Sequence, residues 1–173
     1  MEESILINKR ILAVDDEPDV LETLKELLEE YDGLIFDEAI DYETGYQLLR
    51  SWTYDVVILD IMGVRGFDLL NAAVSLGFPT VMLTAHALSL ENLKMSIEMG
   101  ARAFLPKEKM TEIVSFLEDI LLLDYRSFWR KSFDGLFGTF KAKYGSEWQK
   151  KEKEFLEQIM LGRYEPKPVI LRK

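Results

Sequence analysis

Four short apolar runs each end in, or just before, a residue that could take part in chemistry. Asp15 and Asp16 follow one run, Asp60 follows another, Thr84 ends a third and Lys107 comes shortly after a fourth. If these run ends meet, three carboxylates would repel one another and raise each other's pKa unless a cation lay among them. Carboxylates that leave room for water favour Mg²⁺. The sequence therefore predicts a magnesium site.

Magnesium beside an amine and a hydroxyl indicates phosphoryl chemistry. The metal and Lys107 would neutralise phosphoryl oxygens while a carboxylate attacks phosphorus in line. Asp60 is the predicted nucleophile because it stands alone after the run Val-Val-Ile-Leu, whereas Asp15 and Asp16 are suited to holding the ion. The chain has no cysteine and one histidine, His86, which argues against zinc, a disulfide framework or a cysteine nucleophile.

The elements that would position these residues alternate regularly. Five apolar runs recur along the chain, and each is followed by apolar residues at helical spacing. The runs are Ile11 to Val14, Leu34 to Phe36, Val56 to Leu59, Thr80 to Leu83 and Ala103 to Leu105. This alternation predicts an α/β fold with a five-stranded, parallel, doubly wound sheet. Ligands of such sheets bind beyond the carboxyl ends of the strands, where the candidate residues fall.

Over about residues 8–124 the sequence resembles the receiver domain of two-component response regulators, which has a flavodoxin-like fold. Four motifs in the same order carry the resemblance. They are Val14-Asp15-Asp16-Glu17, Leu59-Asp60-Ile61-Met62, Leu83-Thr84-Ala85 and Phe104-Leu105-Pro106-Lys107. The resemblance implies that Asp60 accepts a phosphoryl group from a sensor histidine kinase or a histidine phosphotransfer protein. It also implies that Mg²⁺ is held by Asp15, Asp16, Asp60 and the carbonyl of Met62.

The resemblance also implies roles for residues on the last two strands. Thr84 would hydrogen-bond the phosphoryl group, Lys107 would pair with it, and Phe104 would move with Thr84 as a switch. The protein would then be a phosphoacceptor switch and not an enzyme in the usual sense. One departure keeps an alternative open: Gly63 and Gly66 come early after Asp60, so the loop is shortened. A receiver-like binding scaffold that is never phosphorylated is that alternative.

Charge divides the chain near residue 124. Residues 1–124 hold 9 basic and 25 acidic side chains, whereas residues 125–173 hold 12 basic and 6 acidic ones. The sequence therefore predicts a receiver domain over 1–124 and a basic, aromatic-rich helical extension over 125–173. Seven aromatic residues in the first half of the extension are spaced mostly three or four apart: Phe128, Trp129, Phe133, Phe137, Phe140, Tyr144 and Trp148.

The partners of this extension stay open at the level of sequence. Its apolar face could pack on the receiver or on a second copy of the chain as a homodimer, or it could contact an unknown downstream protein. The net charge of −10 argues against nucleic acid as a partner. Apolar runs of strand length and an amino terminus without signal-peptide order lead us to expect a cytoplasmic protein without membrane insertion.

Overall fold

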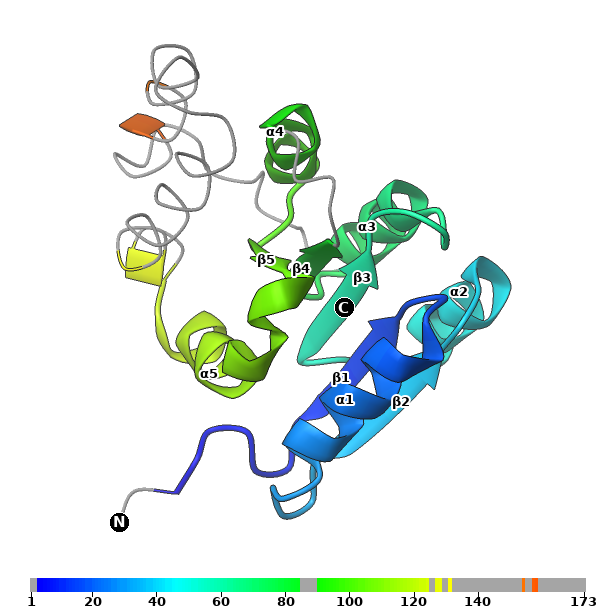
Figure 1. The fold of residues 1–173 in the computed structure, drawn as a ribbon, viewed down its shortest axis with the longest axis vertical. Helices are drawn as coiled ribbons and strands as arrows, with labels where there is room; N and C mark the ends of the chain where they lie inside the picture. The colour runs from blue at the N-terminus through cyan, green and yellow to red at the C-terminus, as the bar shows by residue number, and fades with distance from the viewer. Residues whose placement is uncertain are drawn as a thin grey trace. The chain divides into compact units, whose positions relative to one another are not determined.

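The computed structural model describes residues 3–84, 90–124, 127, 128, 131, 154, 157 and 158. Strands and helices alternate through the first 122 residues (Figure 1). The strands are β1 (Arg10–Val14), β2 (Ile35–Ala39), β3 (Val56–Asp60), β4 (Thr80–Thr84) and β5 (Ala103–Pro106). The α-helices are α1 (Pro18–Leu28), α2 (Tyr42–Ser51), α3 (Gly66–Ser75), α4 (Leu90–Glu98) and α5 (Ile113–Leu122). A 3₁₀ helix, η1 (Lys107–Glu112), leads from β5 into α5.

The five strands form one parallel sheet in the order β2-β1-β3-β4-β5. This confirms the predicted α/β class and the doubly wound sheet. The crossover from β1 to β2 runs in one direction and the remaining three run in the other. Because such crossovers are right-handed, α1 lies on one face of the sheet and α2 to α4 lie on the opposite face. Figure 1 shows α2 and α3 side by side on their face.

The core lies between the sheet and its helices. All five residues of β3 are buried, as expected for the central strand of a sheet covered on both faces. Large, fully buried side chains between the sheet and its helices come from several elements and include Leu12, Leu24, Ile58, Leu59, Leu69 and Leu70. Each such side chain contributes about 1.5–3 kcal/mol relative to an exposed one. The core therefore fixes where the strand ends lie.

Two elements differ from the sequence expectation by more than one residue. Strand β2 continues to Ala39, although the apolar run stops at Phe36, because pairing with β1 holds Asp37 and Glu38 in register. As an edge strand, β2 is covered less, and Ile35 is 46% exposed. Helix α1 ends at Leu28, before the apolar Tyr31 that its spacing includes.

The chain has two compact units, whose boundary lies within α5 between Glu118 and Asp119. The predicted domain limit at residue 124 is not tested by this boundary and stays a prediction. In the second unit, Ser127, Phe128 and Lys131 are helical, Phe128 is buried and Lys131 pairs with Asp119 at 2.8 Å. The other predicted aromatic positions of the extension lie outside the described residues. Among the described residues, no helix is long and apolar enough to cross a membrane.

Candidate functional site

Three predicted metal ligands come together at the carboxyl ends of neighbouring strands. Asp15 and Asp16 follow β1, and Asp60 ends β3, which pairs with β1. One carboxylate oxygen from each residue lies within 4.8 Å of the other two. Asp15 and Asp60 are buried, at 2% and 5% exposure, whereas Asp16 is exposed. Within the described part of the chain, no other group of three acidic or histidine side chains lies this close.

Lys107 joins this cluster from the first residue after β5. Its Nζ lies 2.9 Å from Asp15 Oδ2, 3.4 Å from Asp60 Oδ1 and 3.7 Å from an oxygen of Glu17. Asp15 Oδ1 also accepts a hydrogen bond from the backbone N–H of Glu17 at 2.9 Å. The amine therefore lies close to both buried carboxylates and offsets only part of their negative charge, while Asp16 is exposed to solvent. Sequence reasoning placed Lys107 at this edge but did not show that Asp15 is its nearest partner.

Burial dominates the electrostatics of the cluster. Burial, together with the negative charge of Asp15, raises the pKa of Asp60 to about 6, although Lys107 opposes the rise. Burial also raises the pKa of Asp15 above its usual value, again against Lys107. Burial lowers the pKa of Lys107, but the hydrogen bond and charge of Asp15 outweigh it and leave that pKa raised. The site therefore holds an excess of negative charge that a dication would offset.

The loop between β3 and α3 is packed against the carboxylate of Asp16 and the backbone of Asp60. Gly63 has a φ of +87°, and a Cβ there would meet the carboxylate of Asp16. A Cβ on Gly66 would meet the backbone carbonyl of Asp60 and lie 2.8 Å from the Cα of Ile61. Glycine is therefore needed at both positions for the chain to turn this closely. The shortened loop noted in the sequence does not keep the three carboxylates apart.

The remaining predicted site residues occupy different environments. Thr84 is buried at the end of β4, one residue beyond the partner of Asp60 in the register. Phe104 is buried within β5, so its ring is already inward in this structure. The side chain of Met62 is 66% exposed beside the site. His86 lies outside the described residues.

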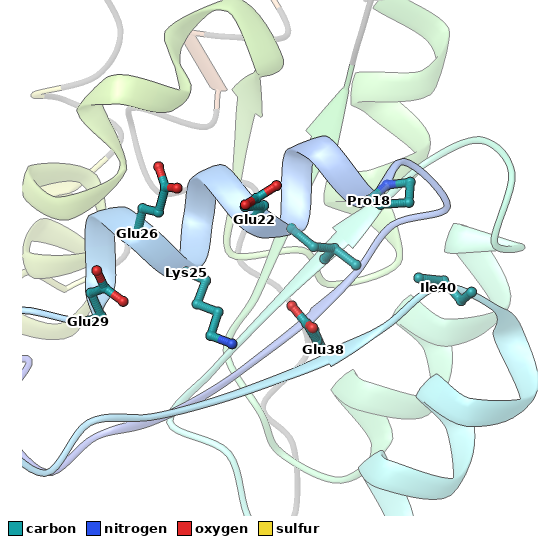
Figure 2. Close-up of a pocket in the computed structure, with 8 residues that line it drawn as sticks. Pro18, Glu22, Lys25, Glu26, Glu29, Glu38 and Ile40 are labelled. Atoms are coloured by element: carbon teal, nitrogen blue, oxygen red, sulfur yellow. The ribbon is translucent and has the colours of Figure 1, made fainter.

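A second acidic region lies in a groove between α1 and β2 (Figure 2). The groove has a volume of about 490 Å³. Its lining combines an apolar part with four glutamates and one lysine: Pro18, Leu21, Ile40, Glu22, Glu26, Glu29, Glu38 and Lys25. Figure 2 shows Lys25 and Glu38 extending into the space between the helix and the strand. All four glutamates are exposed, and none belongs to the cluster of Asp15, Asp16 and Asp60.

Comparison with known proteins matches the chain to one family. A family model described as the response regulator receiver domain matches residues 11–118. The probable transcriptional regulatory protein SilR of Salmonella typhimurium is 37% identical over 102 residues, which cover 57% of this chain and 44% of SilR. The transcriptional regulatory protein CpxR of Escherichia coli K12 is 36% identical over 124 residues, which cover 69% of this chain and 51% of CpxR.

The fold is also found among solved structures. The Mn²⁺-bound form of the response regulator Rcp1 superposes with a TM-score of 0.58 over 67% of this chain and 97% of that one, at 18% identity. The chain spans about half the length of the curated relatives named above. Because both relatives are named as transcriptional regulators, the expectation that nucleic acid is an unlikely partner is not borne out. That expectation rested on the net negative charge of the chain and on the excess of acidic side chains in residues 1–124, although residues 125–173 are basic.

Proposed function

Because the chain belongs to the response regulator receiver domain family, we propose that it is a phosphoacceptor switch, in which Asp60 takes up a phosphoryl group with the help of Mg²⁺. One observation carries the proposal. Oxygens of Asp15, Asp16 and Asp60 lie within 4.8 Å of one another, and the amine of Lys107 lies 3.4 Å from Asp60 Oδ1. This arrangement supplies a nucleophile, ligands for a dication and a positive charge at one strand edge.

The donor set fits Mg²⁺. The three side chains offer only oxygen, and the exposure of Asp16 leaves room for the water ligands that this ion keeps. We propose that Asp15, Asp16 and Asp60 hold the ion together with the carbonyl of Met62. When bound, Mg²⁺ would neutralise negative charge on the carboxylates and on the incoming phosphoryl group. The Mn²⁺ in Rcp1 supports the proposal, because Mn²⁺ shares the preference of Mg²⁺ for oxygen ligands.

The side chains of this chain would do the rest of the chemistry. With a pKa of about 6, Asp60 is mostly ionised at neutral pH and available as a nucleophile. Its carboxylate oxygen would form the new bond to phosphorus while the bond from phosphorus to the imidazole nitrogen of a donor phosphohistidine breaks. Lys107 would pair with one phosphoryl oxygen, and the hydroxyl of Thr84 would donate a hydrogen bond to another. Hydrolysis of the acyl phosphate would reset the switch.

The partners follow from this reaction. We propose a sensor histidine kinase or a histidine phosphotransfer protein as donor, in the cytoplasm. Phe104 and Thr84 would carry the change from the site to the face formed by α4, β5 and α5. An unknown downstream protein would bind that face.

An adduct experiment tests the proposal. The full chain is incubated with Mg²⁺ and a small phosphodonor such as acetyl phosphate, and its intact mass is measured. We expect a single phosphoryl adduct that is lost when Mg²⁺ is chelated and is absent in Asp60→Asn. Asp32→Asn, which removes an exposed carboxylate distant in sequence, serves as the matched control and should still form the adduct. A folded protein that binds Mg²⁺ yet forms no adduct would point to the unphosphorylated scaffold.

A further inference from the structure

The loop that follows Asp60 is held in place by buried side chains and by a contact at its surface. In the loop that joins β3 to α3, Ile61 and Val64 are buried, so their side chains anchor the loop to the core. Gly63 lies directly against the carboxylate of Asp16, and Gly66 lies against the backbone of Asp60. A shift of this loop would therefore move the surroundings of both carboxylates.

Arg65, at the exposed end of the loop, has a backbone conformation that few residues adopt. Its φ of 53° and ψ of 53° are left-handed, which is uncommon for a residue other than glycine. In this conformation its carbonyl accepts hydrogen bonds from the N–H groups of Asp68 and Leu69, at 3.0 and 3.1 Å, and so begins α3. Arg65 thus connects the loop to the helix. Its strained backbone costs free energy, which other contacts of the residue must offset.

The side chain of Arg65 provides that compensation. Its guanidinium carbon lies 4.1 Å from the centre of the Tyr42 ring, and its Nε lies 2.9 Å from Asp68 Oδ2. Tyr42 is the first residue of α2, where Asp41 caps the helix by accepting a hydrogen bond from the Thr44 N–H at 2.8 Å. The Tyr42 ring also stacks on Tyr46, with 5.7 Å between ring centres. Tyr42 is therefore a firmly placed surface for the arginine.

We propose that the contact between Arg65 and Tyr42 is a latch that holds the loop in the form that binds Mg²⁺. Tyr42 and Arg65 are then positioning residues that act through Gly63 and the backbone of Met62, although neither touches the metal. The proposal rests on the magnesium-dependent function proposed above. The latch explains how the five-residue loop between β3 and α3 keeps the backbone conformation that places Met62 and Gly63 beside the carboxylates.

The direction in which Mg²⁺ affinity changes when Arg65 is replaced distinguishes the latch from a purely electrostatic effect of its charge. Removing the positive charge of Arg65 would strengthen Mg²⁺ binding if only long-range charge mattered. If the latch matters, the same substitution weakens binding, because the loop samples forms in which the ligands are displaced. The two explanations therefore predict opposite changes in the dissociation constant for Mg²⁺.

The test is a titration of the full chain with Mg²⁺ alone by calorimetry, without phosphodonor. Three variants are compared with wild type: Tyr42→Leu, Arg65→Gly and Arg50→Ala. Leucine keeps apolar bulk without a ring face, and glycine adopts the left-handed backbone without the side chain. Arg50→Ala is the matched control, because it also removes a positive charge, and the Arg50 guanidinium carbon lies 5.7 Å from the centre of the Tyr46 ring on the same helix.

We expect Tyr42→Leu and Arg65→Gly to weaken Mg²⁺ binding roughly three- to tenfold, which is less than for residues that contact a metal ligand directly, because the latch acts only through the loop. Arg50→Ala should stay within about twofold of wild type. Unchanged or tighter binding in Tyr42→Leu, which leaves the loop sequence intact and can be checked for folding by thermal unfolding in chelator, would overturn the latch alone. A wild-type protein that binds no Mg²⁺ would overturn the proposed function and the latch with it.

Discussion

Two regions of this protein are rich in carboxylates, and they differ in burial more than in charge. At the strand ends, Asp15 and Asp60 are almost fully buried and converge with Asp16 within 4.8 Å. In the groove between α1 and β2, four glutamates are spread along a helix and an edge strand and remain exposed (Figure 2). Water screens the charges of the groove, whereas the protein interior strengthens those at the strand ends.

The comparison shows that the fold, and not the number of acidic residues, brings the buried carboxylates together. Glu22, Glu26 and Glu29 follow helical spacing, so they share a face but point to solvent. Asp15 and Asp60 end adjacent parallel strands, and the sheet forces their side chains to one edge. Four predictions test how far this difference extends, beginning with the largest expected effect.

Replacing Asp16 with asparagine should weaken Mg²⁺ binding by roughly a hundredfold or more. Asp16 is the exposed member of the cluster, so the loss of its charge removes a metal ligand without leaving a buried group unpaired. Calorimetric titration of the full chain with Mg²⁺ measures the change. Glu26→Gln in the groove is the matched control, and it should bind Mg²⁺ like wild type. Equal losses in the two variants would mean that net charge alone attracts the ion.

Replacing Gly66 with alanine should lower the free energy of unfolding by about 2–3 kcal/mol. The new methyl group would meet the backbone carbonyl of Asp60, which cannot yield as a flexible side chain can. Alanine favours helix more than glycine does, so helix propensity acts in the opposite direction. Urea unfolding measures the loss, and Asn71→Ala, at an exposed position of α3, controls for propensity. A Gly66→Ala protein as stable as wild type would show that the backbone of Asp60 and Ile61 can move to make room for a methyl group.

The stability of the metal-free protein should fall as pH rises through the titration of Asp60. The folded protein binds this proton more tightly than the unfolded chain, because the pKa is raised from 3.8 to about 6. The contribution of Asp60 is therefore fully present below about pH 4 and is lost as pH rises through 6. The pKa shift limits the contribution of Asp60 to the free energy of unfolding to about 3 kcal/mol. Because neighbouring groups relax, we expect a contribution of about 1–2 kcal/mol.

Urea unfolding in chelator at about pH 5 and pH 7.5 measures this dependence in wild type and in Asp60→Asn. The variant cannot ionise at this position, so the fall with pH should be smaller by about 1–2 kcal/mol. Asp15, whose pKa is also raised, is present in both proteins, so part of the pH dependence should remain in the variant. The same pH dependence in both proteins would show that the raised pKa of Asp60 does not affect stability.

Much of this site could be predicted from the sequence because strand ends are local features. The runs before Asp15, Asp60 and Thr84 are apolar on both faces of the sheet, which indicates buried parallel strands. Once the topology is known, the residues after those runs must meet. The convergence of the acidic residues therefore required no knowledge of distant side chains.

Other features depend on contacts that leave no pattern in the sequence. Burial separates Asp15 from its neighbour Asp16, and only the packing around β1 shows which of the two faces Lys107. The contact between Tyr42 and Arg65 joins a helix start to a distant loop through two surface side chains of ordinary type. The extra length of β2 comes from pairing with β1 and not from its own composition. Such features follow from tertiary structure.

The smallest effect is expected in the groove, from the double substitution Glu22→Gln and Glu26→Gln. These residues are four apart on α1, where like charges repel, so their removal should stabilise the protein by a few tenths of a kcal/mol. The gain should shrink at high salt because the charges are exposed. Urea unfolding at low and high salt measures it, and Lys25→Gln should have the opposite sign. A change above about 1 kcal/mol would mean that these glutamates are coupled to one another as strongly as the buried aspartates are, and burial would no longer explain how the two acidic regions differ.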